Sequence, residues 1–381
     1  MSINIKEIKR YNATIIITVN YGSIDRMYEY NGQRYIGPLG IAHFIEHMIF
    51  YKKDTTYYEE FDKIGSDINA YTTQNETVYT VSANKNNIYE ALSLLLKMLF
   101  SKPDITNEMV QKEVSVISNE ISQVNNKEAN CLYQYVKDMY GVDINILGTV
   151  NSIKMISKDI ILDIHDKFYS LDNSHVLIVG DVDKGKINDL LTPYSKQSLV
   201  NRGTLCSRPH LLYTVEDSAY INLPWNGKIY EDSAYVNLPW NGKIYTDRIY
   251  LELLVEILCS NSRYGELISS VILGKIQDNY YLRITANSLG LFLLEKEFIV
   301  FLNSISARDV QLAFDTLYQK QLNKSIFLQD DSVSDIADDI LASEIVDMSE
   351  FVECMKNNRE YLEIGFLEAV SEFTKSYIQH V

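Results

Sequence analysis

The 381-residue sequence is poor in cysteine and has no long apolar stretch. Its four cysteines (Cys131, Cys206, Cys259 and Cys354) are far apart, which predicts reduced thiols rather than a disulfide framework or a cysteine metal site. Since no run of about 18 apolar residues occurs, we expect no transmembrane helix. Residues 1–7 lack the apolar block of a signal peptide. These absences together predict a cytoplasmic protein without membrane insertion.

Positive charge is also in deficit. The chain has 35 Lys and Arg against 51 Asp and Glu, a formal net charge of −16. Such a field opposes nucleic-acid binding. It would attract a cationic peptide, or it simply keeps the protein soluble, and both interpretations stay open. The abundance of Ile, Asn, Lys and Tyr indicates an AT-rich bacterial genome.

Histidine is scarce too, yet two of the six histidines stand four residues apart in His43-Phe44-Ile45-Glu46-His47. On a helix these positions project from one face, so two imidazoles could bind one Zn²⁺ with a carboxylate beside its water. The order His-x-x-Glu-His is the inverzincin signature. A chance match has an expectation on the order of 0.01 in this chain. The alternative is an amphipathic helix with two surface histidines, but the apolar neighbours predict burial, which would be costly without an ion.

A catalytic zinc usually takes three protein ligands and leaves one position for water. The predicted helix over residues 107–125 carries Glu113 and Glu120, two turns apart on one face. One of these acids could bind the metal while the other orients a ligand. Taken alone, the same pattern also suits a solvated helix with ordinary surface acids.

At this point the chain resembles the M16 (pitrilysin-like) zinc peptidases, in particular the short M16B type. The resemblance extends over residues 15–185 and is therefore more specific than the pentapeptide. It is carried by Tyr21–Ser23, Gly40–Met48, Gly65–Thr72, Thr77–Tyr79, Glu113–Ile121, Gly148–Thr149, Phe168–Tyr169 and Val179–Val182.

The resemblance implies a role for each residue of the candidate site. It makes His43, His47 and Glu120 the zinc ligands and Glu46 the general base. Glu113 becomes the acid that orients a ligand. The implied activity is endopeptidase cleavage by metal-activated water, with Zn²⁺ as the cofactor.

The resemblance also implies substrate contacts, and here the chain departs from the family pattern. Asn69 and Ala70 match the strand to which a peptide substrate adds as a further strand. The second domain of the family usually carries an Arg followed seven residues later by a Tyr. Tyr280 stands at the Tyr position, a catalytic role, but Leu273 stands where the Arg is expected, and Arg263 fits a different position. We therefore expect a heterodimer with a related M16-like partner subunit that supplies the Arg–Tyr pair, with a homodimer as the alternative.

The order of predicted elements suggests an α+β fold with two M16-like α/β sandwich domains. Each would be a mainly antiparallel sheet with helices packed on one face. We expect a catalytic zinc-binding domain over residues 1–190, an interdomain linker over 191–213 and a second domain without the zinc motif over 214–381. Among the elements expected in the second domain are helices at 264–274 and 348–379 and a strand at 279–286.

A tandem repeat stands out at 216–245. Residues 216–230 and 231–245 agree at fourteen of fifteen positions, Ile221 against Val236 being the exception. One pair is too short for a solenoid. The duplication could display Trp225 or Trp240 to a partner, or it could be a loop insertion, which costs little entropy.

Three functions compete at this stage. The first is a zinc endopeptidase, the catalytic chain of an M16B heterodimer acting in the maturation of a ribosomally made precursor peptide. The second is a non-catalytic peptide-binding or scaffold subunit, which would have little reason to keep the whole set of His43, Glu46, His47 and Glu120. The third is an unrelated zinc hydrolase for small amides, which would leave residues 65–72 and 113–120 unexplained.

Overall fold

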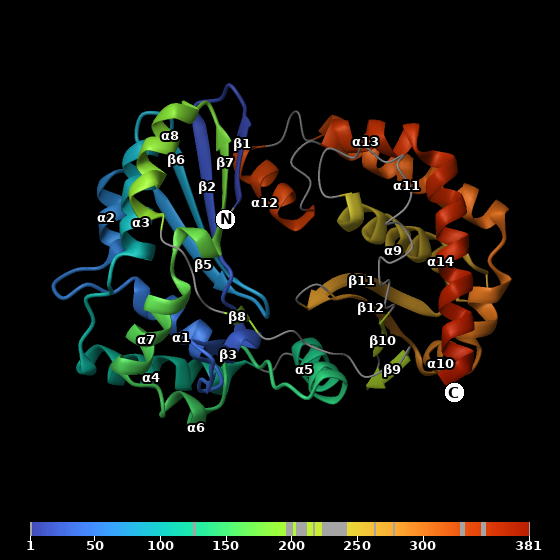
Figure 1. Cartoon of the computed structure of the whole chain (residues 1–381), viewed down its shortest axis with the longest axis horizontal. Coiled ribbons are helices and arrows are strands. Elements are labelled where there is room, and N and C mark those ends of the chain that lie inside the picture. Colours follow the sequence, from blue (N-terminus) through green and yellow to red (C-terminus); the bar gives the residue numbers. More distant parts are fainter. Residues whose placement is uncertain are drawn as a thin grey trace. The chain divides into compact units, whose positions relative to one another are not determined.

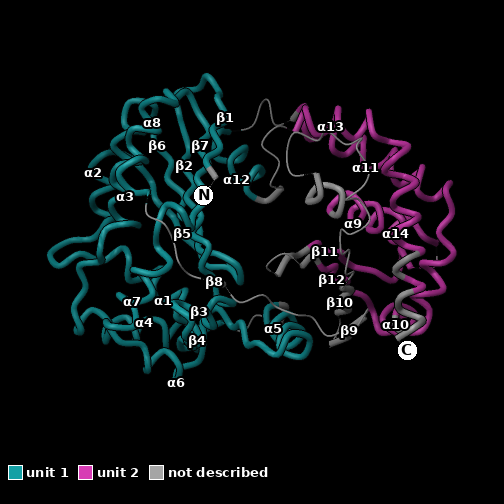
Figure 2. The backbone as a smooth tube through the Cα atoms, in the orientation of Figure 1, with its two compact units in different colours: residues 1–205, 331–346 teal, residues 206–330, 347–381 magenta. Residues whose placement is uncertain are grey.

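The computed structural model of the chain divides into two compact units (Figures 1 and 2). Unit 1 comprises residues 1–205 and 331–346, and unit 2 comprises residues 206–330 and 347–381. The structure describes residues 2–124, 127–195, 201–202, 212–215, 218–222, 242–262, 264–276, 279–327, 332–343 and 348–380. The catalytic-domain and linker boundaries expected from the sequence stay a prediction, and most of the repeat over 216–245 lies outside the described residues, as does Arg263.

A five-stranded sheet forms the centre of unit 1. Its strand order is β1-β7-β2-β6-β5, with β1 and β7 parallel and all other neighbours antiparallel. This arrangement leaves β5 at one edge. The strands are β1 (Ser2–Glu7), β2 (Asn12–Val19), β5 (Asp67–Thr72), β6 (Thr77–Asn84) and β7 (Ser174–Gly180).

The central strand β2 is buried on both faces, because every residue from 13 to 19 is shielded from solvent. Side chains alternate along a strand, so the odd positions, such as Ile15 and Ile17, join the main core. The even positions Thr14, Ile16 and Thr18 face the other way. Helix α12 (Val333–Ser343) packs against β2 and β7 there, opposite α2, α3 and α8 (Figure 1). A helix from the C-terminal half of the sequence thus completes unit 1.

The helices on the main core side follow the apolar spacing of the sequence. In α3, Leu92, Leu95, Leu96 and Leu99 recur on one face and are fully buried. These helices are α1 (Ile41–Ile49), α2 (Tyr57–Lys63), α3 (Ile88–Phe100), α4 (Asn107–Gln123), α6 (Val150–Ile153), α7 (Lys158–Phe168) and α8 (Lys184–Leu191). Helix α5 (Lys127–Tyr140) also belongs to unit 1, but its residues are not part of the main core. Beside them lies a small sheet of β3 (Met27–Tyr30), β4 (Gln33–Ile36) and β8 (Asn201–Arg202).

Two glycines fix the start of α1, where two loops cross. Gly40 precedes the helix with φ of 87°, and a Cβ there would lie 2.6 Å from the carbonyl oxygen of Leu147. Gly148 has φ of 74°, and a Cβ added there would lie 2.5 Å from the carbonyl oxygen of Leu39. Both positions need a left-handed conformation and lack room for a side chain, so only glycine fits them well.

Unit 2 contains a four-stranded antiparallel sheet of order β11-β12-β10-β9. Its strands are β9 (Leu212–Val215), β10 (Ser218–Asn222), β11 (Ile268–Ile276) and β12 (Asn279–Ala286). Its helices are α9 (Gly242–Ser260), α10 (Ser288–Ser304), α11 (Ala307–Phe327), α13 (Met348–Asn357) and α14 (Arg359–His380). Strand β10 falls within the first copy of the repeat, where it pairs with β12 and with β9.

The α+β class with mainly antiparallel sheets is confirmed, and the structure adds α12 on the second face of the first sheet. The helix expected at 264–274 is wrong, because residues 268–276 form β11. Leu273 lies opposite Leu282 and Val271 opposite Ile284 in β12, so long-range pairing decides the conformation of this short apolar run. The helix expected at 348–379 is two helices that break at Asn358.

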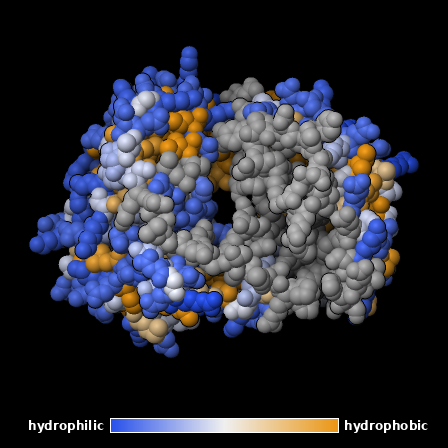
Figure 3. All heavy atoms as spheres, viewed as in Figure 1, coloured by the Kyte–Doolittle hydropathy of each residue, from blue (hydrophilic) through white to orange (hydrophobic). Residues whose placement is uncertain are grey.

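The described helices include none with the length and apolar character needed to cross a membrane. On the face shown in Figure 3 the described surface of unit 1 is largely hydrophilic, with apolar side chains in smaller patches.

Candidate metal centre

Helix α1 presents His43, Glu46 and His47 from one face, as the spacing predicts. Its opposite side carries Phe44, Ile45 and Met48 into the main core, so the helix cannot rotate without exposing apolar surface. His43 and Glu46 are each only 8% exposed. His43 and Glu46 are therefore shielded from solvent, whereas the His47 side chain is 27% exposed.

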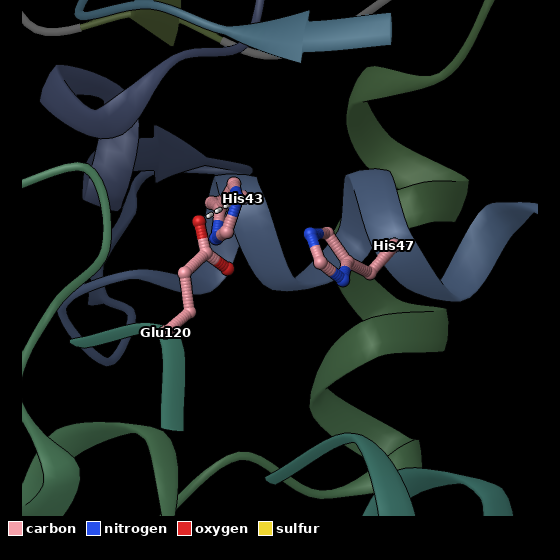
Figure 4. Close-up of side chains that lie close together, drawn as sticks. All are labelled: His43, His47 and Glu120. Carbon is pink, nitrogen blue, oxygen red and sulfur yellow. Dashed lines mark ion pairs between the residues drawn. The ribbon is translucent and has the colours of Figure 1, made fainter. Parts of the chain in front are cut away.

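Helix α4 brings Glu120 to the two imidazoles (Figure 4). One ligand atom from each of His43, His47 and Glu120 lies within 4.8 Å of the others. The Nε2 atom of His43 is 3.9 Å from the Oε1 atom of Glu120, and the two imidazole centroids are 4.5 Å apart. Among the described residues, this is the group of histidine, cysteine and acidic side chains that could hold a metal ion.

Glu113 lies beside His47, next to its Nδ1 atom. Its Oε1 atom is 2.7 Å from Nδ1 of His47, and its Oε2 atom accepts a hydrogen bond of 2.6 Å from the Tyr51 hydroxyl. The Glu113 side chain is only 3% exposed. A carboxylate at Nδ1 favours the tautomer in which Nε2 of His47 carries a lone pair toward the metal position.

Glu46 is held by a different partner. The Thr72 hydroxyl, at the end of the edge strand β5, donates a hydrogen bond of 2.6 Å to Oε2 of Glu46. Burial raises the pKa of Glu46, although the Thr72 hydrogen bond and nearby His47 act against that shift. A carboxyl group with a raised pKa is suited to accept and return a proton near neutral pH.

The two histidines differ in their readiness to bind a metal. Burial, together with the neighbouring His47, lowers the pKa of His43 to about 4, so His43 is neutral at pH 7. Burial alone would also lower the pKa of His47, but Glu113, Glu46 and Glu120 outweigh that effect and raise it. Zinc binding would therefore displace a proton from His47 when that residue is charged.

The donor set fits Zn²⁺. Two imidazoles and one carboxylate form a known three-ligand set for catalytic zinc, with one position left for water. Two further carboxylates, Glu46 and Glu113, lie around the same histidines, and a divalent cation would offset this excess of buried negative charge.

Comparison with known proteins supports the same conclusion. The family model described as Insulinase (Peptidase family M16) matches residues 6–149, which include every residue of the cluster. Over these residues the chain is similar to peptidase family M16.

Two curated relatives and one solved structure are also similar to the chain. The chain is 33% identical over 207 residues to the "Uncharacterized zinc protease YmfH" of Bacillus subtilis, covering 51% of this chain and 48% of the relative. It is 28% identical over 184 residues to the "Mitochondrial-processing peptidase subunit beta" of Saccharomyces cerevisiae, covering 46% and 38%. The chain thus spans about half the length, or less, of these curated relatives. A putative M16-like peptidase from Alicyclobacillus acidocaldarius shares the fold, with a TM-score of 0.70 and 20% identity over 96% of this chain and 92% of that one.

The other site residues predicted from the family resemblance lie outside the cluster of His43, His47 and Glu120. Asn69 and Ala70 are in the edge strand β5, where the Asn69 carboxamide oxygen accepts a hydrogen bond from the Ala70 N–H at 3.0 Å. Asn69 and Tyr71 line a pocket of about 560 Å³ that α12 also borders. Alternation along β5 directs Ala70 and Thr72 to the opposite side, where Glu46 lies. Tyr280 is in β12 of unit 2, and its side chain lies outside the described residues.

Sequence reasoning missed Tyr51 and Thr72. Thr72 closes the segment Gly65–Thr72 and could have been suspected because it ends the strand that lies beside α1. No spacing rule connects Tyr51 with Glu113, 62 residues away, so only the fold shows that contact.

Proposed function

We propose that this chain is the catalytic subunit of a zinc-dependent endopeptidase, with His43, His47 and Glu120 as the zinc ligands. The observation that carries the proposal is the convergence of these three side chains beside Glu46, a buried carboxylate fixed by Thr72. When bound, zinc would act as a Lewis acid and lower the pKa of its water from 15.7 to about 7.

The residues of the chain have separate tasks in this reaction. Glu46 accepts a proton from the attacking water and later returns it to the leaving amine. The Thr72 hydrogen bond fixes which oxygen of Glu46 is free for that transfer. Glu113 holds the tautomer of His47.

The substrate is an extended peptide. Strand β5 pairs with β6 on one side and forms the edge of the sheet on the other, so a peptide could add there as a further strand. Ala70 and Thr72 would then place the peptide backbone next to Glu46. We assign Asn69 and Ala70 to substrate binding on this basis.

A second subunit would complete the enzyme. The family's Arg is replaced by Leu273, which pairs with Leu282 in β12, so this chain lacks that cation at the matching position. We propose a related M16-like partner that supplies the Arg–Tyr pair, with Tyr280 as a remnant of the pair in this chain and a homodimer as the alternative. The proposed role is maturation of a ribosomally made precursor. We place it in the bacterial cytoplasm, where the thiols of Cys131, Cys259 and Cys354 would stay reduced.

Metal analysis and peptide cleavage test the proposal together. The native chain should bind one zinc ion, and His43→Ala, His47→Ala and Glu120→Gln should each lose it, whereas Glu108→Gln, a matched change in the exposed first turn of α4, should not. Glu46→Gln should keep zinc but cleave peptides about 10²–10⁴-fold more slowly, measured with and without the partner. A native chain that binds no zinc would overturn the proposal. Zinc binding without any peptide cleavage that depends on Glu46 would favour the non-catalytic scaffold.

A further inference from the structure

We infer that Tyr51 is a positioning residue for the metal centre, acting on His47 through Glu113. The inference rests on the proposed zinc site and adds a residue to which no function has been assigned. It concerns a chain of two hydrogen bonds, from the Tyr51 hydroxyl to Glu113 and between Glu113 and Nδ1 of His47.

The geometry gives each oxygen of Glu113 one partner. Oε2 accepts from Tyr51 at 2.6 Å, and Oε1 lies 2.7 Å from His47. A carboxylate that is 3% exposed has little access to water that could replace a lost partner. Without the Tyr51 hydroxyl, Oε2 would be left buried and unpaired, and Glu113 would gain by rotating toward another donor. That rotation would weaken its hold on His47.

Tyr51 itself is held firmly by the backbone. It lies two residues after the end of α1, and its N–H donates to the carbonyl oxygen of Met48 at 3.1 Å. Tyr51 and Thr56 form a β-bridge, and Tyr57 N–H donates to the carbonyl oxygen of Phe50 at 2.9 Å. These contacts hold the turn after α1, from which the Tyr51 hydroxyl reaches Glu113. Helix α1 and this turn together carry two proposed ligands, the proposed base Glu46 and the support for Glu113.

The Tyr51 hydroxyl has a task that packing alone would not require. A phenylalanine would fill the same space, but it could not donate to Glu113. Partners behind a metal ligand typically contribute 10- to 100-fold to metal affinity or activity. Because Tyr51 acts through Glu113, we expect the lower end of that range.

The test compares Tyr51→Phe with Tyr58→Phe in the whole chain. Tyr58 stacks on Phe50 at a centroid distance of 4.2 Å and is 52% exposed, so the control makes the same chemical change nearby. Zinc affinity, measured by competition with a chromophoric chelator, should fall about tenfold in Tyr51→Phe and stay unchanged in Tyr58→Phe. The visible spectrum of the Co²⁺-substituted protein should change only in Tyr51→Phe, because it reports ligand geometry.

A double-mutant cycle identifies the route. If Tyr51 acts through Glu113, adding Tyr51→Phe to Glu113→Gln should weaken zinc binding by less than about twofold further. Fully additive effects would overturn the inference. So would a Tyr51→Phe protein that is less stable without metal yet has native zinc affinity and a native Co²⁺ spectrum, since that is a structural role. These outcomes leave the proposed function intact, whereas a native chain that binds no zinc overturns both.

Discussion

The position of the Glu46 carboxylate depends on the Thr72 hydroxyl, which donates to its Oε2 atom. Thr72→Val removes the hydrogen bond of 2.6 Å while keeping the shape of the side chain. Because an unsatisfied buried carboxylate oxygen costs about 1–3 kcal/mol, Glu46 should leave its position, and we expect kcat to fall roughly 10- to 100-fold.

Zinc affinity separates this effect from damage to the metal centre. Thr72 contacts no proposed ligand directly, so zinc content and Kd of Thr72→Val should match the native chain. A Thr72→Ser variant keeps the hydroxyl and should restore most of the rate. Equal loss of rate in both variants would show that the hydroxyl is not what matters.

Single residues also show what the sequence could and could not predict. The trio of His43, Glu46 and His47 is local, and helical spacing is enough to place it on one face. Only the family resemblance allowed Glu120 rather than Glu113 to be predicted as the third ligand. The structure brings Glu120 to the histidines, whereas Glu113 lies beside Nδ1 of His47. Tyr51 and Thr72 depend on contacts between distant segments, which no local pattern contains.

At the level of elements, the start of α1 is set by a loop crossing. Gly40→Ala would add a Cβ 2.6 Å from the carbonyl oxygen of Leu147 in a left-handed conformation. We expect it to destabilise unit 1 by about 1–3 kcal/mol and to weaken zinc binding, since α1 must shift. Urea unfolding and zinc titration measure the two effects.

Gly141→Ala is the matched control, because Gly141 also has a positive φ, of 73°, but a Cβ added there would meet nothing within 4 Å. It should cost about 1–2 kcal/mol from the conformation alone and leave zinc affinity unchanged. Equal zinc affinities in the two variants would show that the crossing does not position α1.

Helix α11 begins with a reciprocal cap whose strength depends on pH. Asp309 Oδ2 accepts from the Ser306 N–H at 2.8 Å and from the Ser306 hydroxyl at 2.6 Å, and these hydrogen bonds lower the pKa of Asp309. A carboxyl whose pKa is lowered by folding stabilises the protein above its unfolded pKa, about 3.9, and stops doing so as the pH falls through the folded value.

The expected result is a pH-dependent difference in the free energy of unfolding. Asp309→Ala should lower stability by about 0.5–1 kcal/mol at pH 7, with solvent exposure keeping the value small. The difference should shrink toward zero below about pH 4. Gln311→Ala, an exposed change on the same helix, should show no such pH dependence. A constant difference from pH 7 to pH 3 would contradict the role of the charge.

Elements were predicted well where the local pattern and the long-range contacts agree. The regular leucines of α3 indicate a helix on their own, and the helix predicted over residues 107–125 is present as α4. Residues 268–276 have a short apolar pattern that suits either a helix or a strand, and pairing with β12 makes them a strand. No local signal in residues 333–343 shows that α12 packs on the first sheet.

At the scale of the whole molecule, the duplication offers a direct test. Deleting residues 216–230 joins Val215 to the second copy, whose residues 233–237 differ from β10 only by Val236 in place of Ile221. Those residues could pair with β12 in the same register, with Val236 opposite Leu282. We expect a folded protein within about 1 kcal/mol of the native chain, because an Ile-to-Val change costs about 0.5–1.5 kcal/mol and the shorter loop offsets part of it.

Calorimetry and size-exclusion chromatography with the partner measure the outcome. Deleting residues 218–222 is the control, because it removes the strand but leaves the second copy to replace it across a longer loop. Loss of partner binding without loss of stability would assign the duplication to association. Unfolding of unit 2 in the first deletion would show that both copies are structural.

Helix α12 has a consequence for how the protein is made. The ribosome completes the strands of the first sheet by residue 180, but the helix that covers one side of β2 and β7 begins only at residue 333. At about 5–20 residues per second, that apolar side of the sheet stays exposed for roughly 10 to 30 s during synthesis. A nascent chain of this kind is a natural client for chaperones, and a fragment that stops before α12 should aggregate.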